Sequence, residues 1–107
     1  MTQLDLNTLF SLTGKIALIT GGSRGIGRMI AQGFLQAGAK VYITARKKAD
    51  CEETAKELSS FGPCTAIPTD ISTAEGRAAL LKAYCEKEDK LHILINNAGT
   101  NWGNVFD

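Results

Sequence analysis

The stretch Thr20-Gly21-Gly22-Ser23-Arg24-Gly25-Ile26-Gly27 separates two segments with different apolar patterns. Before it, residues 16–19 (IALI) form an almost entirely apolar run, which is typical of a strand buried on both faces. After it, residues 25–37 carry apolar side chains at i, i+4 and i+8, namely Ile26, Ile30 and Phe34. This spacing places them on one face of a helix. The stretch is therefore predicted to be the turn between a buried strand and an amphipathic helix.

The glycines of this turn suit the close approach of a phosphate group. Glycine tolerates positive φ and has no Cβ to obstruct a ligand. The free amides and the positive dipole end of the following helix attract phosphate oxygens. The spacing TGxxxGxG differs from both the GxxxxGK[ST] of a nucleoside-triphosphate loop and the common GxGxxG fingerprint. We predict a dinucleotide-pyrophosphate site, and a glycine-rich turn without a ligand is the alternative.

The alternation of apolar runs and helical patterns continues toward the C-terminus. The predicted elements are a strand at 41–44, a helix from Asp50 to Phe61, a strand from Cys64 to Pro68, a helix from Ser72 to about Glu88 and a strand from Leu91 to Ile95. Gly38 is expected to end the first helix, and the D-x-x-E and S-x-x-E patterns at 50–53 and 72–75 are expected to cap the other two.

This order of elements predicts an α/β fold with helices on the faces of a parallel sheet. Right-handed crossovers favour the strand order 3-2-1-4, which puts the ligand-binding switch point between the first and fourth strands. We predict an incomplete, truncated doubly wound fold of the Rossmann type. Residues 1–107 are expected to form the N-terminal part of a single domain.

Composition narrows the possible functions further. The formal net charge is +1, and the basic cluster at 46–48 is short and has no interleaved aromatic residues, which does not favour nucleic-acid binding. No apolar run approaches the ~20 residues that span a bilayer, and residues 1–12 lack the basic start of a secretory signal. We expect a cytoplasmic protein with no membrane partner. The three cysteines have no CxxC or zinc spacing, so reduced thiols and no metal site are expected.

Four landmarks in the sequence match one family in order and position. They are the glycine stretch at 20–27, the NNAG at 96–99, the LTGK at 12–15 and the Asp70-Ile71 pair. With these residues the chain resembles the short-chain dehydrogenases/reductases over nearly all of its length. The TNWG at 100–103 is most similar to the β-ketoacyl reductases of that family, including those linked to rhamnolipid synthesis.

The resemblance implies roles for individual residues. The loop glycines would admit the pyrophosphate, and Asp70 would accept a hydrogen bond from the adenine amine with Ile71 beside the ring. From its chemistry alone, a surface turn residue is the alternative explanation of Asp70. Residues after the fourth strand would line the ribose region, and Asn97 would chiefly brace the central strands. Apart from two arginines, the cofactor-binding residues so implied are Gly21, Ser23, Gly25, Ile26, Gly27, Asp70, Ile71, Asn96, Ala98 and Gly99.

The residues after the second strand bear on which nicotinamide cofactor is bound. A carboxylate at this place would bind the ribose 2′-hydroxyl and favour NAD, but the sequence continues as Thr44-Ala45-Arg46-Lys47-Lys48. Arg46, together with Arg24 of the glycine loop, can donate paired hydrogen bonds to a 2′-phosphate. At ~1.5–3 kcal/mol for each charged hydrogen bond, two arginines favour NADP by about a hundredfold or more. We predict NADP(H), and a solvated basic turn is the alternative.

The family's catalytic serine and Tyr-x-x-x-Lys pair are expected after the NNAG, and they are not among the 107 residues. Four residues after Tyr42 is Arg46, and four residues after Tyr84 is Glu88. The resemblance implies that the complete enzyme passes hydride from NADPH to a small-molecule carbonyl, such as a 3-oxoacyl thioester, and forms a dimer or tetramer. This chain is expected to bind the cofactor without catalytic residues of its own, and a non-catalytic NADP-binding module is the alternative function. The fourth strand is expected to be an open sheet edge that favours self-association.

Overall fold

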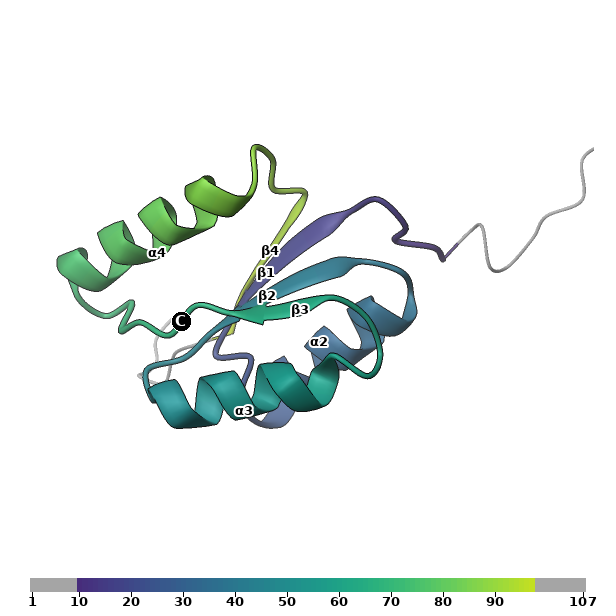
Figure 1. Cartoon of the computed structure of the whole chain (residues 1–107), viewed down its shortest axis with the longest axis horizontal. Helices are drawn as coiled ribbons and strands as arrows, with labels where there is room; N and C mark the ends of the chain where they lie inside the picture. Colours follow the sequence, from purple (N-terminus) through teal and green to yellow (C-terminus); the bar gives the residue numbers. More distant parts are fainter. Residues whose placement is uncertain (1–9, 98–107) are drawn as a thin grey trace, which may run out of the picture.

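The structure, a computed structural model, describes residues 10–97. Its strands are β1 (Ile16–Thr20), β2 (Lys40–Thr44), β3 (Cys64–Ala66) and β4 (Ile93–Asn96), and its helices are α2 (Gly25–Gln36), α3 (Lys48–Leu58) and α4 (Ala74–Lys87). The strands form one parallel sheet in the order β3-β2-β1-β4 (Figure 1). The predicted α/β fold and strand order are therefore confirmed.

The helices lie on opposite faces of the sheet. Figure 1 shows α2 and α3 together on one side and α4 on the other. Because successive strand residues point to opposite faces, β1 supplies Ala17 and Ile19 to the α2–α3 side, where they pack with Leu35 and Leu58. The α4 side has a smaller buried cluster, Leu18, Tyr42, Ile67 and Tyr84. The main core of the described residues therefore lies between the sheet and α2–α3.

The second face of the sheet is only partly covered. Leu94, on the edge strand β4, is 58% exposed, and Leu81 of α4 is 65% exposed. A parallel sheet ordinarily has both faces buried. The position of β4 at the edge agrees with the expectation from the sequence, and the resulting self-association stays a prediction.

The predicted helix starts were wrong at both capping patterns. α3 begins at Lys48 after the N-cap residue Lys47, so Asp50 lies in its first turn and is not the cap. α4 begins after Thr73, whose hydroxyl accepts a hydrogen bond from the Gly76 amide at 2.9 Å, so the cap is one residue beyond Ser72. The Ser72 side chain instead donates to the Asp70 carboxylate at 2.6 Å. In both cases the side chain that was expected to cap the helix binds another residue: Asp50 binds Arg24, and Ser72 binds Asp70.

Two strand bounds also differ by two residues from those expected. β3 ends at Ala66, although Ile67 and Thr69 still donate to the carbonyls of Ile43 and Ala45 at 2.9 and 3.0 Å. Pro68 lies between these two donors in the continuation of an edge strand and faces away from β2, so its missing amide hydrogen removes no bond to that strand. β4 begins at Ile93, two residues later than predicted.

Candidate functional site

The glycine loop leaves the carboxyl end of β1 and enters α2. Gly21 and Gly25 have φ values of 68° and 53°, in the left-handed region that favours glycine. The Gly21 amide donates to the Thr44 carbonyl at the end of β2, at 2.8 Å. The loop is therefore anchored across the carboxyl ends of two neighbouring strands, which is the edge where open parallel sheets bind ligands.

Gly27 is where the first turn of α2 touches the loop. A Cβ placed on Gly27 would lie 2.2 Å from the Gly21 carbonyl oxygen and 2.6 Å from the Asn97 side-chain nitrogen. These distances are far below van der Waals contact, so the residue has no room for a side chain. The absence of a side chain at Gly27 lets the first turn of α2 lie directly against the backbone of the loop that precedes it.

Thr20 and Asn97 connect the loop to the central strands. The Thr20 hydroxyl accepts from the Asn97 amide at 2.8 Å and donates to the Asn96 side-chain oxygen at 3.0 Å. The Asn97 side chain in turn donates to the Gly21 carbonyl at 3.3 Å. The end of β4 is thus joined both to β1 and to the loop, so the switch point between these strands is braced by polar contacts. Sequence reasoning gave Thr20 no role beyond the motif, and its position as the last residue of a buried strand was the available signal.

Asp70 forms a local turn before α4. Its Oδ1 accepts hydrogen bonds from the Ser72 amide at 3.0 Å and from the Ser72 hydroxyl at 2.6 Å. These bonds, with a smaller contribution from the charge of Arg46, lower the pKa of the Asp70 carboxyl. The carboxylate is therefore charged at neutral pH and is an acceptor at the carboxyl edge of the sheet. Its contact with an adenine amine stays a prediction.

The two arginines predicted for the site have different surroundings. The Arg24 guanidinium forms an ion pair with Asp50 of α3, with 2.7 Å between Nη2 and Oδ2. Arg46 is exposed and lies just after β2, two residues before α3 begins. The structure therefore brings the end of the Arg24 side chain to the first turn of α3, at a residue four positions after Arg46.

A polar side of α3 lies along the loop and the first turns of α2. Thr54 donates from its hydroxyl to the Ser23 carbonyl at 3.2 Å, and Glu57 pairs with Arg28 at 2.9 Å. Together with Asp50, these side chains occupy positions i, i+4 and i+7 of α3. The contacts of these three side chains were not identified from the sequence, because their partners lie in the glycine loop and in α2.

An apolar groove of about 350 Å³ opens on the α4 side of the sheet. Ile71 is among the residues that line it, together with the apolar side chains of Leu80, Leu81, Leu91 and Leu94. Thr20 and Asn96 lie at the end of this groove that adjoins the glycine loop. Ile71 and Asn96, both predicted site residues, thus face one groove.

Other predicted site residues are not brought into that groove. Ile26 is 68% exposed on α2, and no contact in the structure assigns it to a ligand. Ala98 and Gly99 lie outside the described residues. Ser23 contributes its backbone carbonyl to the contact with α3, as described above.

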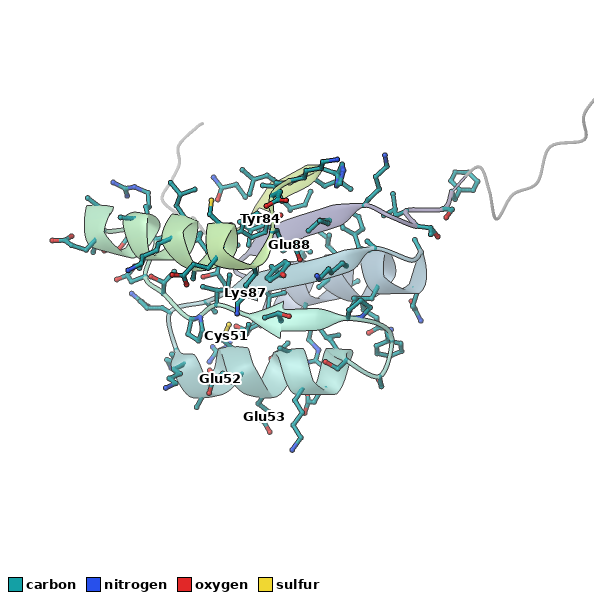
Figure 2. The ribbon with its side chains drawn as sticks, turned by 45° about the horizontal axis from the view of Figure 1, so that its top comes forward. Cys51, Glu52, Glu53, Tyr84, Lys87 and Glu88 are labelled. Atoms are coloured by element: carbon teal, nitrogen blue, oxygen red, sulfur yellow. The ribbon has the colours of Figure 1, made fainter. Side chains whose placement is uncertain are left out.

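The two tyrosines are held by structural contacts. Tyr42 donates to Glu88 at 2.5 Å, Tyr84 donates to the Lys90 carbonyl, and the two rings meet edge to face with centroids 5.1 Å apart. Figure 2 shows Tyr84 and Glu88 at the C-terminal end of α4, beside the sheet. Burial is the main cause that raises the pKa of both tyrosines, which makes them weaker acids. Glu88 also pairs with Lys40, so this cluster fastens α4 to β2.

Residues 10–97 also show whether a metal site or a membrane-spanning helix is present in this part of the chain. No group of three or more His, Cys, Asp or Glu side chains in this range is arranged to hold a metal ion. None of the helices in the same range is both long and apolar enough to cross a membrane. Cys51, Cys64 and Cys85 are free thiols in the structure.

Comparison with known proteins places this geometry in a family. The family model described as short chain dehydrogenase matches residues 15–107. A rhamnolipids biosynthesis 3-oxoacyl-[acyl-carrier-protein] reductase from Pseudomonas aeruginosa is 55% identical over 102 residues, which are 95% of this chain and 40% of that protein. The oxidoreductase UcpA from Escherichia coli is 44% identical over 89 residues, 82% of this chain and 34% of that protein.

Solved structures give the same result. A Pseudomonas aeruginosa RhlG/NADP active-site complex has a TM-score of 0.83 at 57% identity, covering 85% of this chain and 37% of that one. L-Sorbose reductase from Gluconobacter frateurii, complexed with NADPH and L-sorbose, has a TM-score of 0.82 at 36% identity, covering 90% of this chain and 37% of that one. The chain thus spans about two fifths of the length of these relatives. The glycine loop, the strand order and the matches over most of the described residues together show that this chain belongs to the short-chain dehydrogenase family.

Proposed function

We propose that this chain binds NADP(H) and is the cofactor-binding part of a short-chain dehydrogenase/reductase. The observation that carries the proposal is the contact between Gly27 and the Gly21 carbonyl, which leaves no space for a Cβ. This contact brings the start of α2, with its free amides and positive dipole end, against a loop at the switch point of the sheet. That arrangement is suited to the two phosphates of a dinucleotide.

The preference for NADP over NAD is proposed from the charges at the end of β2. Arg46, Lys47 and Lys48 follow the strand where an NAD-binding protein carries an acid. Arg24 is held by Asp50 at the first turn of α3, the helix that follows these residues. The relative from Pseudomonas aeruginosa with the same fold is described as a complex with NADP, which supports this choice.

The remaining cofactor contacts belong to the same proposal. Asp70 would accept from the adenine amine, Ile71 would lie beside the ring, and Asn96, Ala98 and Gly99 would line the ribose region. The single NADP-binding domain that we propose includes residues 1–107. When bound, NADPH would supply a hydride, and the residues of this chain would hold and orient the dinucleotide.

For the whole protein we propose reduction of a small-molecule carbonyl, with a 3-oxoacyl thioester as the substrate class. The name of the Pseudomonas aeruginosa relative, a 3-oxoacyl reductase, supports that class. A cytoplasmic location and a homo-oligomeric assembly are part of the same proposal. The second candidate is a non-catalytic NADP-binding module, whose role would be binding of the cofactor alone.

Calorimetric titration of the 107-residue chain with NADPH and NADH tests the cofactor proposal. We expect saturable binding of both, with NADPH bound about tenfold or more tightly, because each charged hydrogen bond contributes ~1.5–3 kcal/mol. Arg46→Ala should weaken NADPH about tenfold and leave NADH nearly unchanged. Lys56→Ala, an exposed cation near the end of α3, is the control. Equal loss toward both cofactors in Arg46→Ala would refute the phosphate contact, and a folded chain that binds neither would refute the proposed function.

The reading frame beyond Asp107 separates the two candidate functions. A serine and a Tyr-x-x-x-Lys pair downstream, with NADPH oxidation that depends on a 3-oxoacyl thioester in the protein that carries them, would support the reductase. A stop codon directly after Asp107 would support the binding module.

A further inference from the structure

We propose that Asp50 is an internal competitor for the cofactor's 2′-phosphate, and that it limits the selectivity for NADP over NAD. In the structure its carboxylate forms an ion pair with the Arg24 guanidinium, one of the two groups expected to bind the phosphate. This inference rests on the proposed function, because it concerns how tightly the 2′-phosphate is bound at the same site.

The first step of the argument is the position of the ion pair. Arg24 is the N-cap residue of α2, and Asp50 is the third residue of α3, four positions after Arg46. Their contact therefore brings the guanidinium from the glycine loop to the first turn of α3, directly after the basic β2–α3 connection. We expect the 2′-phosphate to bind at that connection, so the carboxylate holds the arginine close to the expected position of that group.

The second step is the chemistry of the contact. Oδ2 of Asp50 accepts from Nη2 of Arg24 at 2.7 Å, as a phosphate oxygen would. A carboxylate and a phosphate are both anions that bind the planar guanidinium through paired donors. When the phosphate arrives, it must share Arg24 with Asp50 or displace it, and the two anions repel each other at short range.

The third step is how the pair is held in place. Thr54, one helical turn after Asp50, is buried and donates to the Ser23 carbonyl at 3.2 Å. Glu57 lies on the same side of α3 and pairs with Arg28. Because this side of α3 is fixed to the loop through Thr54 and to α2 through Glu57, Asp50 stays within reach of Arg24.

The exposure of the two side chains sets the size of the effect. The Arg24 side chain is 70% exposed and the Asp50 side chain 40% exposed, so the contact is an ordinary solvent-screened ion pair. Pairs of this kind change an equilibrium by about one-and-a-half- to fivefold. Asp50 is therefore expected to reduce affinity for the 2′-phosphate by a few-fold without preventing binding.

The test uses two nucleotides that differ only in the 2′-phosphate. Calorimetric titration of the 107-residue chain with adenosine 2′,5′-bisphosphate and with adenosine 5′-monophosphate compares wild type with Asp50→Asn. We expect the variant to bind the bisphosphate about two- to fivefold more tightly and the monophosphate unchanged. The gain should shrink at high salt, since exposed charges are screened.

Matched variants exclude a general effect of charge. Glu52→Gln removes one negative charge from an exposed position two residues along α3, which faces away from the side that carries Asp50. Figure 2 shows Glu52 on α3. This control should leave the ratio of the two affinities unchanged. In an Arg24→Ala background, Asp50→Asn should no longer tighten the bisphosphate.

Folding is monitored separately, because Asp50 also lies favourably at the N-terminal end of α3. Circular dichroism melting identifies any loss of structure. A second variant, Asp50→Ser, removes the same charge and retains a residue that suits a helix start. The two variants should give the same selectivity.

Three results would overturn the inference. They are unchanged or weaker bisphosphate binding by folded Asp50→Asn, equal tightening of both nucleotides, and tightening that persists without Arg24. If wild type prefers the bisphosphate and any of these is seen, the inference alone fails. If folded wild type binds neither nucleotide, the proposed function fails with it.

Discussion

Replacing Gly27 with alanine places a methyl group where the structure has no space for one. The new Cβ would lie 2.2 Å from the Gly21 carbonyl oxygen and 2.9 Å from its carbon, both of which are backbone atoms. Relief requires α2 and the loop to separate by about 1.3 Å, given that non-bonded heavy atoms normally approach to ~3.5 Å. Overpacking of this kind costs about 1–3 kcal/mol. For a domain of this size, each kcal/mol lowers the melting temperature by about 4–8 °C.

The same displacement should weaken cofactor binding. The loop and the start of α2 would no longer present their amides in one arrangement, and a loss of about 1.4 kcal/mol is a tenfold loss of affinity. Thermal melting by circular dichroism and calorimetric titration with NADPH measure the two effects. Both should be seen in Gly27→Ala.

The control is the identical substitution in the same helix at Gly33. A Cβ there meets no atom within 4 Å, and the residue is exposed. Alanine is preferred over glycine inside a helix, so Gly33→Ala should stabilise the chain by about 0.5–1 kcal/mol and leave binding unchanged. If Gly27→Ala melts and binds like wild type, the argument from close packing of the loop is wrong.

Three further changes test other parts of the structure. Thr20→Val removes the hydroxyl that joins β1 to β4 and leaves the Asn97 backbone amide without this acceptor, so it should lower the free energy of unfolding by about 1–3 kcal/mol in chemical denaturation. Thr20→Ser keeps the hydroxyl and should lower it less; equal losses in the two variants would argue against the hydrogen bonds. Glu88 bonds to Lys40 and Tyr42, which lowers the pKa of its carboxyl, so the stabilisation is present above the unfolded-state pKa and is lost as pH falls through the folded-state value. Glu88→Gln should therefore lower the melting temperature at neutral pH and progressively less below about pH 4, and a difference that does not depend on pH would contradict this. Leu94→Lys places a charge on the exposed face of the edge strand and should reduce the self-association measured by light scattering. Lys82→Arg, which keeps the charge, is the control; an unchanged oligomer size in Leu94→Lys would show that Leu94 is not part of the interface.

Much of the fold was predictable because its signals are local. The apolar run of β1, the glycines that follow it and the i, i+4, i+8 spacing of α2 occur within 22 consecutive residues, from Ile16 to Ala37. Gly38 ends that helix with a φ of 102°, as expected from a residue without a Cβ. The order of strands follows from the handedness of crossovers, which holds for parallel sheets in general. These features require no knowledge of which polar groups meet.

The site was predictable only in part, because polar side chains choose partners that folding brings near. Asp50 was expected to cap α3, but its carboxylate binds Arg24, which is 26 residues earlier in the chain. Ser72 was expected to cap α4, but its hydroxyl binds Asp70 and leaves the cap to Thr73. A capping pattern identifies residues able to accept an amide hydrogen and says nothing of competing donors.

The sequence by itself determined the α/β alternation, the strand order and the presence of a glycine loop at the switch point, since periodicity and backbone freedom are properties of neighbouring residues. Tertiary structure alone decided that Thr20 links β1 to β4 and that α3 holds the glycine loop through Asp50 and Thr54. The physical reason is that a hydrogen bond or ion pair depends on a few ångströms of separation. For residues far apart in the chain, that separation is set only when the sheet and helices pack.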